Sequence, residues 1–128
     1  MVANPSDALA ARRYAQVVGV VLVILFVVGL VLGDQSWMGI LNTDLVEDLT
    51  HLITGALLVY VGFALRDSAM VRTIVGVLGI VYLLVGVLSF IAPTIFGLIP
   101  HGYSIVDDIL HLALGIIGIA VAWLVGRS

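Results

Sequence analysis

The stretch Val-Glu-Asp-Leu-Thr-His-Leu-Ile-Thr-Gly at Val46 to Gly55 recurs sixty positions later as Val-Asp-Asp-Ile-Leu-His-Leu-Ala-Leu-Gly at Val106 to Gly115. Each copy places an Asp three residues before a His at the head of a long apolar run; the two pairs are Asp48 with His51 and Asp108 with His111. Ionisable side chains in apolar membrane segments are costly, so they mark positions with a structural or functional role. The motif predicts two related halves, each with one Asp/His pair entering a membrane span.

Composition sets the class of protein. Hydrophobic residues make up 62% of the 128 residues and charged residues 10%, whereas soluble domains are about half apolar and about a quarter charged. Four apolar stretches are each about long enough to cross a ~30 Å hydrocarbon core as a helix. They are residues 17–33, 49–65, 74–92 and 109–126. We therefore expect an all-α membrane protein with four transmembrane helices in a single domain, residues 1–128.

The charges predict an orientation. All basic residues are arginines, and they fall at the N-terminus, the second connection and the C-terminus, namely at Arg12, Arg13, Arg66, Arg72 and Arg127. With four spans these places share one side, and the positive-inside bias assigns that side to the cytoplasm. We expect a multi-pass protein of the cell (inner) membrane with both termini cytoplasmic. Four aromatic residues near the predicted boundaries are interpreted as interfacial anchors: Tyr14, Trp37, Tyr103 and Trp123.

Glycines extend the repeat beyond the motif. Gly19 and Gly29 of the first span correspond to Gly76 and Gly86 of the third, both pairs ten residues apart. Each half is therefore predicted to be a helical hairpin, with repeat one at about 14–66 and repeat two at about 71–127. Hairpins of the same orientation would be related by a pseudo-twofold axis along the membrane normal. The short second connection makes the second and third helices neighbours and favours an up-down-up-down four-helix bundle.

Helical spacing predicts which faces pack together. Small residues share a stripe with the motif on the second and fourth helices, and a similar stripe runs along the third. The stripes are Asp48, His51, Gly55 and Gly62; Asp108, His111, Gly115, Gly118 and Ala122; and Gly79, Tyr82, Gly86 and Ser89. Because membrane helices associate by close backbone approach, these faces are expected to contact other helices. The glycines of the first and third helices are candidates for contacts with a further copy.

We expect half of the motif acids, Glu47 and Asp107, to have a capping role. Asp44 with Glu47, and Ser104 with Asp107, have the spacing of N-cap and N3 residues, which satisfies backbone donors at a helix start. Asp48, Asp108, His51 and His111 lie further in and have three interpretations. They could hydrogen-bond across the bundle and stabilise it, bind one divalent metal such as zinc, iron or manganese, or hold a haem between the two His. A weaker alternative is a small transporter or proton path.

Other functional classes lack support. There is no cysteine, hence no disulfide or thiolate site, and no basic patch for nucleic acid. No nucleophile with a base and no phosphate-binding loop is present, so we expect no catalytic residue, no enzyme and no obligatory cofactor. The leading hypothesis is an accessory or interaction subunit in the lipid bilayer, whose partner is a second copy or another membrane protein.

The motifs also resemble those of a known family of small four-helix membrane proteins of bacteria and archaea, a domain of unknown function, number 4383. The resemblance rests on Leu41-Asn42 leading to Asp48 through Gly55, and on Arg72 to Gly86 followed by Asp108 through Gly115. It covers nearly the whole chain from about residue 14. It implies a four-span membrane domain and supplies no activity; members often have Asn where Asp48 and Asp108 stand, and Asn is a poor metal ligand.

Overall fold

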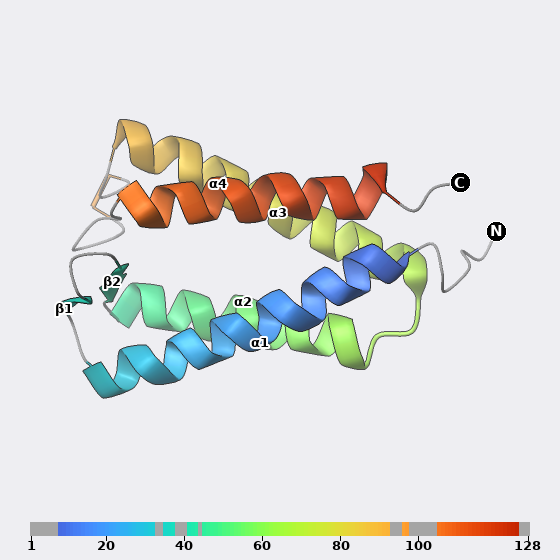
Figure 1. Ribbon diagram of the computed structural model, residues 1–128, viewed down its shortest axis with the longest axis horizontal. Coiled ribbons are helices and arrows are strands. Elements are labelled where there is room, and N and C mark those ends of the chain that lie inside the picture. The colour runs from blue at the N-terminus through green and yellow to red at the C-terminus, as the bar shows by residue number, and fades with distance from the viewer. Residues whose placement is uncertain are drawn as a thin grey trace.

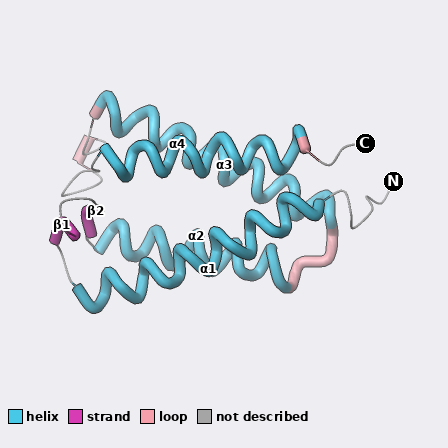
Figure 2. The backbone as a smooth tube through the Cα atoms, in the orientation of Figure 1, coloured by secondary structure: helices cyan, strands magenta, loops and turns pink. Residues whose placement is uncertain are grey.

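A computed structural model of the chain describes residues 8–32, 35–37, 41–43, 45–92, 96–97 and 105–125 (Figure 1). Its helices are α1 (Leu9–Leu32), α2 (Leu45–Phe63), α3 (Ser68–Ile91) and α4 (Ile105–Ile119), and α4 continues as a π-helical turn, η2 (Ala120–Leu124). All four are long and apolar enough to cross a membrane when η2 is counted with α4. This confirms the predicted helical class and indicates a multi-pass membrane protein. Two short strands, β1 (Gln35–Trp37) and β2 (Leu41–Thr43), pair antiparallel between α1 and α2 (Figure 2). The sequence did not predict this strand pair.

The helices begin earlier than the apolar stretches do. α1 starts at Leu9, so Arg12 and Arg13 are helical, and α3 starts at Ser68. The start of α3 is fixed by Asp67, whose carboxylate accepts hydrogen bonds from the backbone N–H groups of Ala69 and Met70 at 3.0 and 3.3 Å. Hydropathy detects only residues suited to hydrocarbon, whereas a helix extends to the residue that caps its free backbone donors.

The helices pack chiefly as two pairs, α1 with α2 and α3 with α4. Figure 1 shows each helix running opposite to the one before it. The end of the molecule that carries the α2–α3 connection is named the connection end, and the opposite end, with β1 and β2, the strand end. α2 and α3, expected to be neighbours, contact each other far less than each contacts its own hairpin partner.

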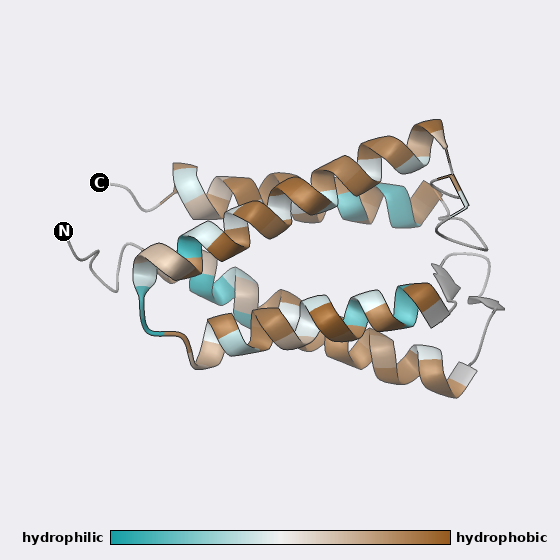
Figure 3. Ribbon diagram, turned by 180° about the vertical axis from the view of Figure 1, so that it is seen from behind, coloured by the Kyte–Doolittle hydropathy of each residue, from teal (hydrophilic) through white to brown (hydrophobic). Residues whose placement is uncertain are grey.

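Small residues form the interface within each hairpin. The predicted stripes are buried at every glycine and at Ala122, Tyr82 and Ser89. A Cβ built at Gly55 would lie 3.0 Å from Leu22 Cβ and from the backbone nitrogen of Val23, so α1 and α2 are in backbone contact there. Large apolar side chains face outward instead, with Val31 at 79% exposed. Figure 3 shows that hydrophobic residues predominate along the helices. This distribution suits a lipid solvent, in which helices associate through small residues.

The glycines of α1 and α3 are not open to a second copy, which corrects the expectation that they mediate further assembly. Gly19, Gly29, Gly76 and Gly86 are all buried. A Cβ at Gly19 would lie 2.7 Å from the backbone nitrogen of Val59, and one at Gly86 would lie 2.9 Å from the Leu112 side chain. Their small size is used within the hairpins.

Polar side chains near the connection end donate hydrogen bonds to backbone carbonyls close to the ends of α2 and η2. Gln16 Nε2 donates to the Gly62 oxygen and Arg72 Nε to the Ala122 oxygen, both at 2.8 Å. Gly62 and Ala122 are sixty residues apart, as the two motifs are. These bonds provide partners for backbone groups that water would otherwise solvate.

Tyr14 is not an interfacial anchor, and that interpretation is wrong. Its side chain is 7% exposed, and its hydroxyl donates to the Leu114 oxygen of α4 at 2.8 Å. The bond joins one hairpin to the other. A buried tyrosine needs such an acceptor because its hydroxyl would otherwise lose the hydrogen bonds that water provides.

Candidate functional site

The predicted site residues occupy the first two turns of α2 and α4, at the strand end. Figure 3 shows hydrophilic segments of these helices there, within otherwise apolar spans. Asp48 and Asp108 are each 4% exposed, and His51 and His111 are half-buried. A carboxylate with so little access to water requires compensating polar contacts inside the protein.

The side chain of each motif Asp packs against the first helix of its own hairpin. A Cβ at Gly29 of α1 would come within 1.9 Å of Asp48 Oδ1, so the missing side chain of Gly29 makes room for the carboxylate. In the second hairpin, the Ser89 hydroxyl of α3 donates to Asp108 Oδ1. Hydrogen bonds to ionised groups are stronger than neutral ones. Both acids therefore belong to the interface between the two helices of one hairpin.

The two His lie near each other. His111 is within electrostatic range of His51, Asp107 and Asp108. Its ring stacks on that of Tyr82, with centroids 5.8 Å apart and an interplanar angle of 15°. His111 therefore contacts α3 of its own hairpin, as Asp108 does, and it also interacts electrostatically with His51 of the other hairpin.

Tyr82 extends this cluster to the other hairpin. Its hydroxyl donates to Thr54 Oγ1 of α2 at 3.0 Å, and Thr54 in turn donates to the Thr50 oxygen at 2.7 Å. The chain of contacts runs from His111 on α4 through Tyr82 on α3 to Thr54 on α2. We name the set His51, His111, Tyr82 and Thr54 the bridging cluster.

The four predicted metal ligands do not form one group. Asp48 lies against α1, while His111 stacks on Tyr82 of α3. Within the described ranges, no three His, Asp or Glu side chains are placed together as a metal ion would require. His111 does interact electrostatically with His51 of the other hairpin. The metal and haem hypotheses stay predictions.

The first-turn acids are also buried, with Glu47 at 2% and Asp107 at 8% exposed. Their predicted capping partners, Asp44 and Ser104, lie outside the described residues, as do the side chains of the predicted anchors Trp37 and Tyr103. The capping boxes and these two anchors therefore stay predictions. Burial of Glu47 and Asp107 nevertheless places both acids against protein, at the positive end of a helix dipole.

Sequence reasoning missed Thr54 and the role of Tyr14. Thr54 and Leu114 are the ninth residues of the two motif copies, and each accepts a hydrogen bond from a tyrosine of the other hairpin. One signal was present for Tyr82: it lies far from either end of α3. A tyrosine deep in a membrane span needs an internal acceptor, since its hydroxyl cannot reach the headgroups.

Comparison with known proteins gives one match. No curated protein and no solved structure matches the chain. A family model, Domain of unknown function (DUF4383), matches residues 1–64, which end one residue beyond α2 and so contain the whole first hairpin. The matched range covers less of the chain than the expected resemblance did, since it does not include α3 and α4. With half of its length matched, the chain belongs to the DUF4383 family.

Proposed function

We propose that the protein is a non-enzymatic integral membrane protein, acting as an accessory or interaction subunit, whose Asp-x-x-His motifs stabilise the strand-end half of its helix bundle. One observation carries the proposal: His111 stacks on Tyr82, and Tyr82 donates to Thr54 of the other hairpin. The outward surface is apolar on all four helices. Such a surface can contact only lipid tails or the helices of another membrane protein.

The two hairpins are held together by relatively few contacts, so single hydrogen bonds between them matter. Contacts within each hairpin are extensive, while contacts between hairpins are fewer. Interhelical hydrogen bonds in membranes are worth ~0.6 kcal/mol on average and up to ~1.7 kcal/mol. The bond from Tyr82 to Thr54 would therefore be a sizeable fraction of the free energy that docks one hairpin on the other, together with the bond from Tyr14 to Leu114.

The architecture that we propose is a tandem repeat of two hairpins, up-down-up-down, with a pseudo-twofold axis along the membrane normal and both termini in the cytoplasm. Support comes from similar contacts near the connection end of each hairpin, those to the Gly62 and Ala122 carbonyls, and from the arginines near that end. The absence of native cysteine allows a direct test. A cysteine replacing Ala64, which is exposed, should react with a membrane-impermeant maleimide only after the inner membrane is opened. Labelling in intact cells would contradict the orientation.

The proposed role of the motif is tested by His51→Leu combined with His111→Leu. We expect the double variant to melt at a lower temperature than the native protein in mild detergent, because the bridging cluster loses both imidazoles. His101→Leu, at the remaining histidine of the chain, which lies outside both motif copies, is the matched control and should leave the melting temperature unchanged. A double variant as stable as the native protein would refute the role.

The proximity of His51 and His111 favours one alternative, a metal- or haem-binding protein. Imidazole nitrogen binds zinc, iron and manganese. Elemental analysis of the natively purified protein separates the two functions: about one metal per chain, lost in the same double variant, would favour the cofactor, and metal-free native protein would favour the structural role. An absorption spectrum would distinguish haem from a bare ion.

A further inference from the structure

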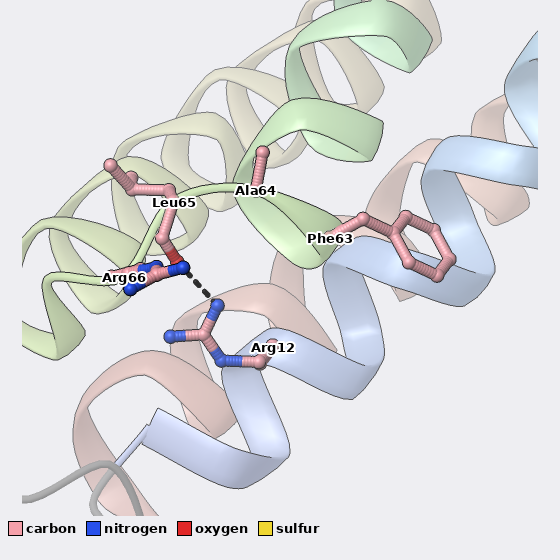
Figure 4. Close-up of a pocket in the computed structure, with 5 residues that line it drawn as sticks. All are labelled: Arg12, Phe63, Ala64, Leu65 and Arg66. Carbon is pink, nitrogen blue, oxygen red and sulfur yellow. Dashed lines mark hydrogen bonds between the residues drawn. The ribbon is translucent and has the colours of Figure 1, made fainter.

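A pocket of about 610 Å³ opens at the connection end (Figure 4). Its lining combines Arg12 of α1 with the last residue of α2 and the three that follow it: Phe63, Ala64, Leu65 and Arg66. The membrane-length segment of α2 ends at Phe63. The pocket therefore lies where a hydrocarbon core would give way to lipid headgroups.

Arg12 is held in place by the last turn of α2 and the residues that follow it. Its Nη1 donates to the Val61 and Leu65 oxygens, as Figure 4 shows for Leu65. A guanidinium has five N–H donors in a fixed plane. Among the described residues, Arg12 donates only through Nη1, which leaves the donors of Nη2 and Nε for a further acceptor. The guanidinium is thus positioned before any ligand arrives.

Arg66 supplies a second positive charge and is exposed. The neighbouring acid, Asp67, is already used as the cap of α3, where it accepts two backbone N–H groups. Phe63 adds an apolar surface next to the two arginines, with 62% of its side chain exposed. Two guanidinium groups beside an exposed aromatic ring match a molecule with a phosphate at one end and hydrocarbon at the other. Arginine is suited to phosphate because its planar donors pair with two oxygens at once.

We propose that this pocket binds the headgroup of an anionic phospholipid, with Arg12 and Arg66 contacting the phosphate and Phe63 the first part of the acyl chains. Basic side chains at an anionic membrane surface each raise binding about fivefold, equivalent to ~1 kcal/mol. The proposal requires only that the connection end meets a membrane surface. It is independent of the role of the bridging cluster at the other end of the helices.

The test uses the full chain in mild detergent, titrated with phosphatidylglycerol or phosphatidylcholine and followed by native mass spectrometry. We expect phosphatidylglycerol to be retained in preference to phosphatidylcholine. Arg66→Gln should weaken phosphatidylglycerol binding about fivefold. Arg13→Gln is the matched control, because Arg13 is also exposed, lies next to Arg12 and does not line the pocket. It removes the same charge and should leave binding unchanged. Arg66 is the preferred target since Arg12→Gln would also remove the contacts that close α2.

Three results would overturn the proposal. Equal retention of the two lipids would show that the phosphatidylglycerol charge is not recognised. Equal weakening by Arg66→Gln and Arg13→Gln would show attraction to overall charge rather than to the pocket. Displacement of the lipid by inorganic phosphate at a similar concentration would show a site for a free anion in place of a lipid.

Discussion

Replacing Gly115 with Ala is expected to force α3 and α4 apart. A Cβ at this position would lie 2.6 Å from the backbone nitrogen of Leu83 and 2.7 Å from the Gly79 oxygen. Ordinary contact begins at 3.4 Å, so the helices must separate by roughly 0.8 Å. A gap of 0.5–1 Å removes about a quarter to a half of the dispersion energy of each atom pair. Backbone atoms cannot rotate out of the way as a flexible side chain can.

The magnitude follows from two opposing terms. Overpacking costs about 1–3 kcal/mol, and backbone clashes place Gly115→Ala near the upper value. Alanine recovers about 1 kcal/mol of helix propensity relative to glycine. The free energy of unfolding should therefore fall by about 2 kcal/mol.

Gly118→Ala is the matched control, one turn along the same face of α4. Its Cβ would lie 3.1 Å from the Tyr14 hydroxyl and 3.2 Å from Gly79 Cα, a mild clash that the gain in helix propensity should offset. Both variants can be compared by reversible denaturation in mixed micelles, followed by circular dichroism. If Gly115→Ala is as stable as Gly118→Ala, the close approach of α3 and α4 is refuted.

Further substitutions test individual polar contacts by thermal melting in detergent. Ser89→Ala should lower the free energy of unfolding by about 1–3 kcal/mol, because the buried carboxylate of Asp108 loses its hydroxyl donor. The control Thr50→Ala removes an exposed hydroxyl that is bonded within its own helix, so it should cost much less; equal costs would contradict the Ser89 contact. Gln16→Leu should lower the free energy of unfolding by about 1 kcal/mol because it removes the hydrogen bond to the Gly62 oxygen. Thr73→Ala, at the corresponding exposed position of α3, should be nearly neutral; the reverse order would contradict the Gln16 contact. Tyr14→Phe should cost about 0.6 kcal/mol, and an unchanged melting temperature would restore its interpretation as an anchor.

The sequence predicted the helical class and the packed faces because both depend on local pattern. Apolar runs of membrane length identify the spans, and glycines repeated at helical spacing identify the faces that touch, as Gly55 and Gly115 do. Helix ends were predicted less well. The start of α3 depends on the capping carboxylate of Asp67, which lies outside the apolar run and has no hydropathy signal. The β1–β2 pair is too short to leave a periodic pattern.

For the candidate site, the sequence predicted which helix faces are packed but not the contacts that connect the side chains. Burial of Asp48 and Asp108 agrees with their place on the packed stripes. Spacing alone cannot show that Asp108 meets Ser89 while the ring of His111 stacks on Tyr82. Nor can it show that Tyr82 reaches Thr54, since this contact depends on how the two hairpins are docked. The misinterpretation of Tyr14 has the same origin: a tyrosine near the end of a span can face headgroups or protein, and only the packing decides.

The most direct test of the account is a double-mutant cycle between Thr54 and Tyr82, the hydrogen-bonded pair that joins α2 of one hairpin to α3 of the other. The variants are Thr54→Val, Tyr82→Phe and their combination, each measured by reversible unfolding in mixed micelles. The account predicts a favourable coupling energy of about 0.6 kcal/mol, with about 1.7 kcal/mol as the upper end. Strictly additive effects, with no coupling, would show that this contact does not hold the hairpins together and would contradict the central claim.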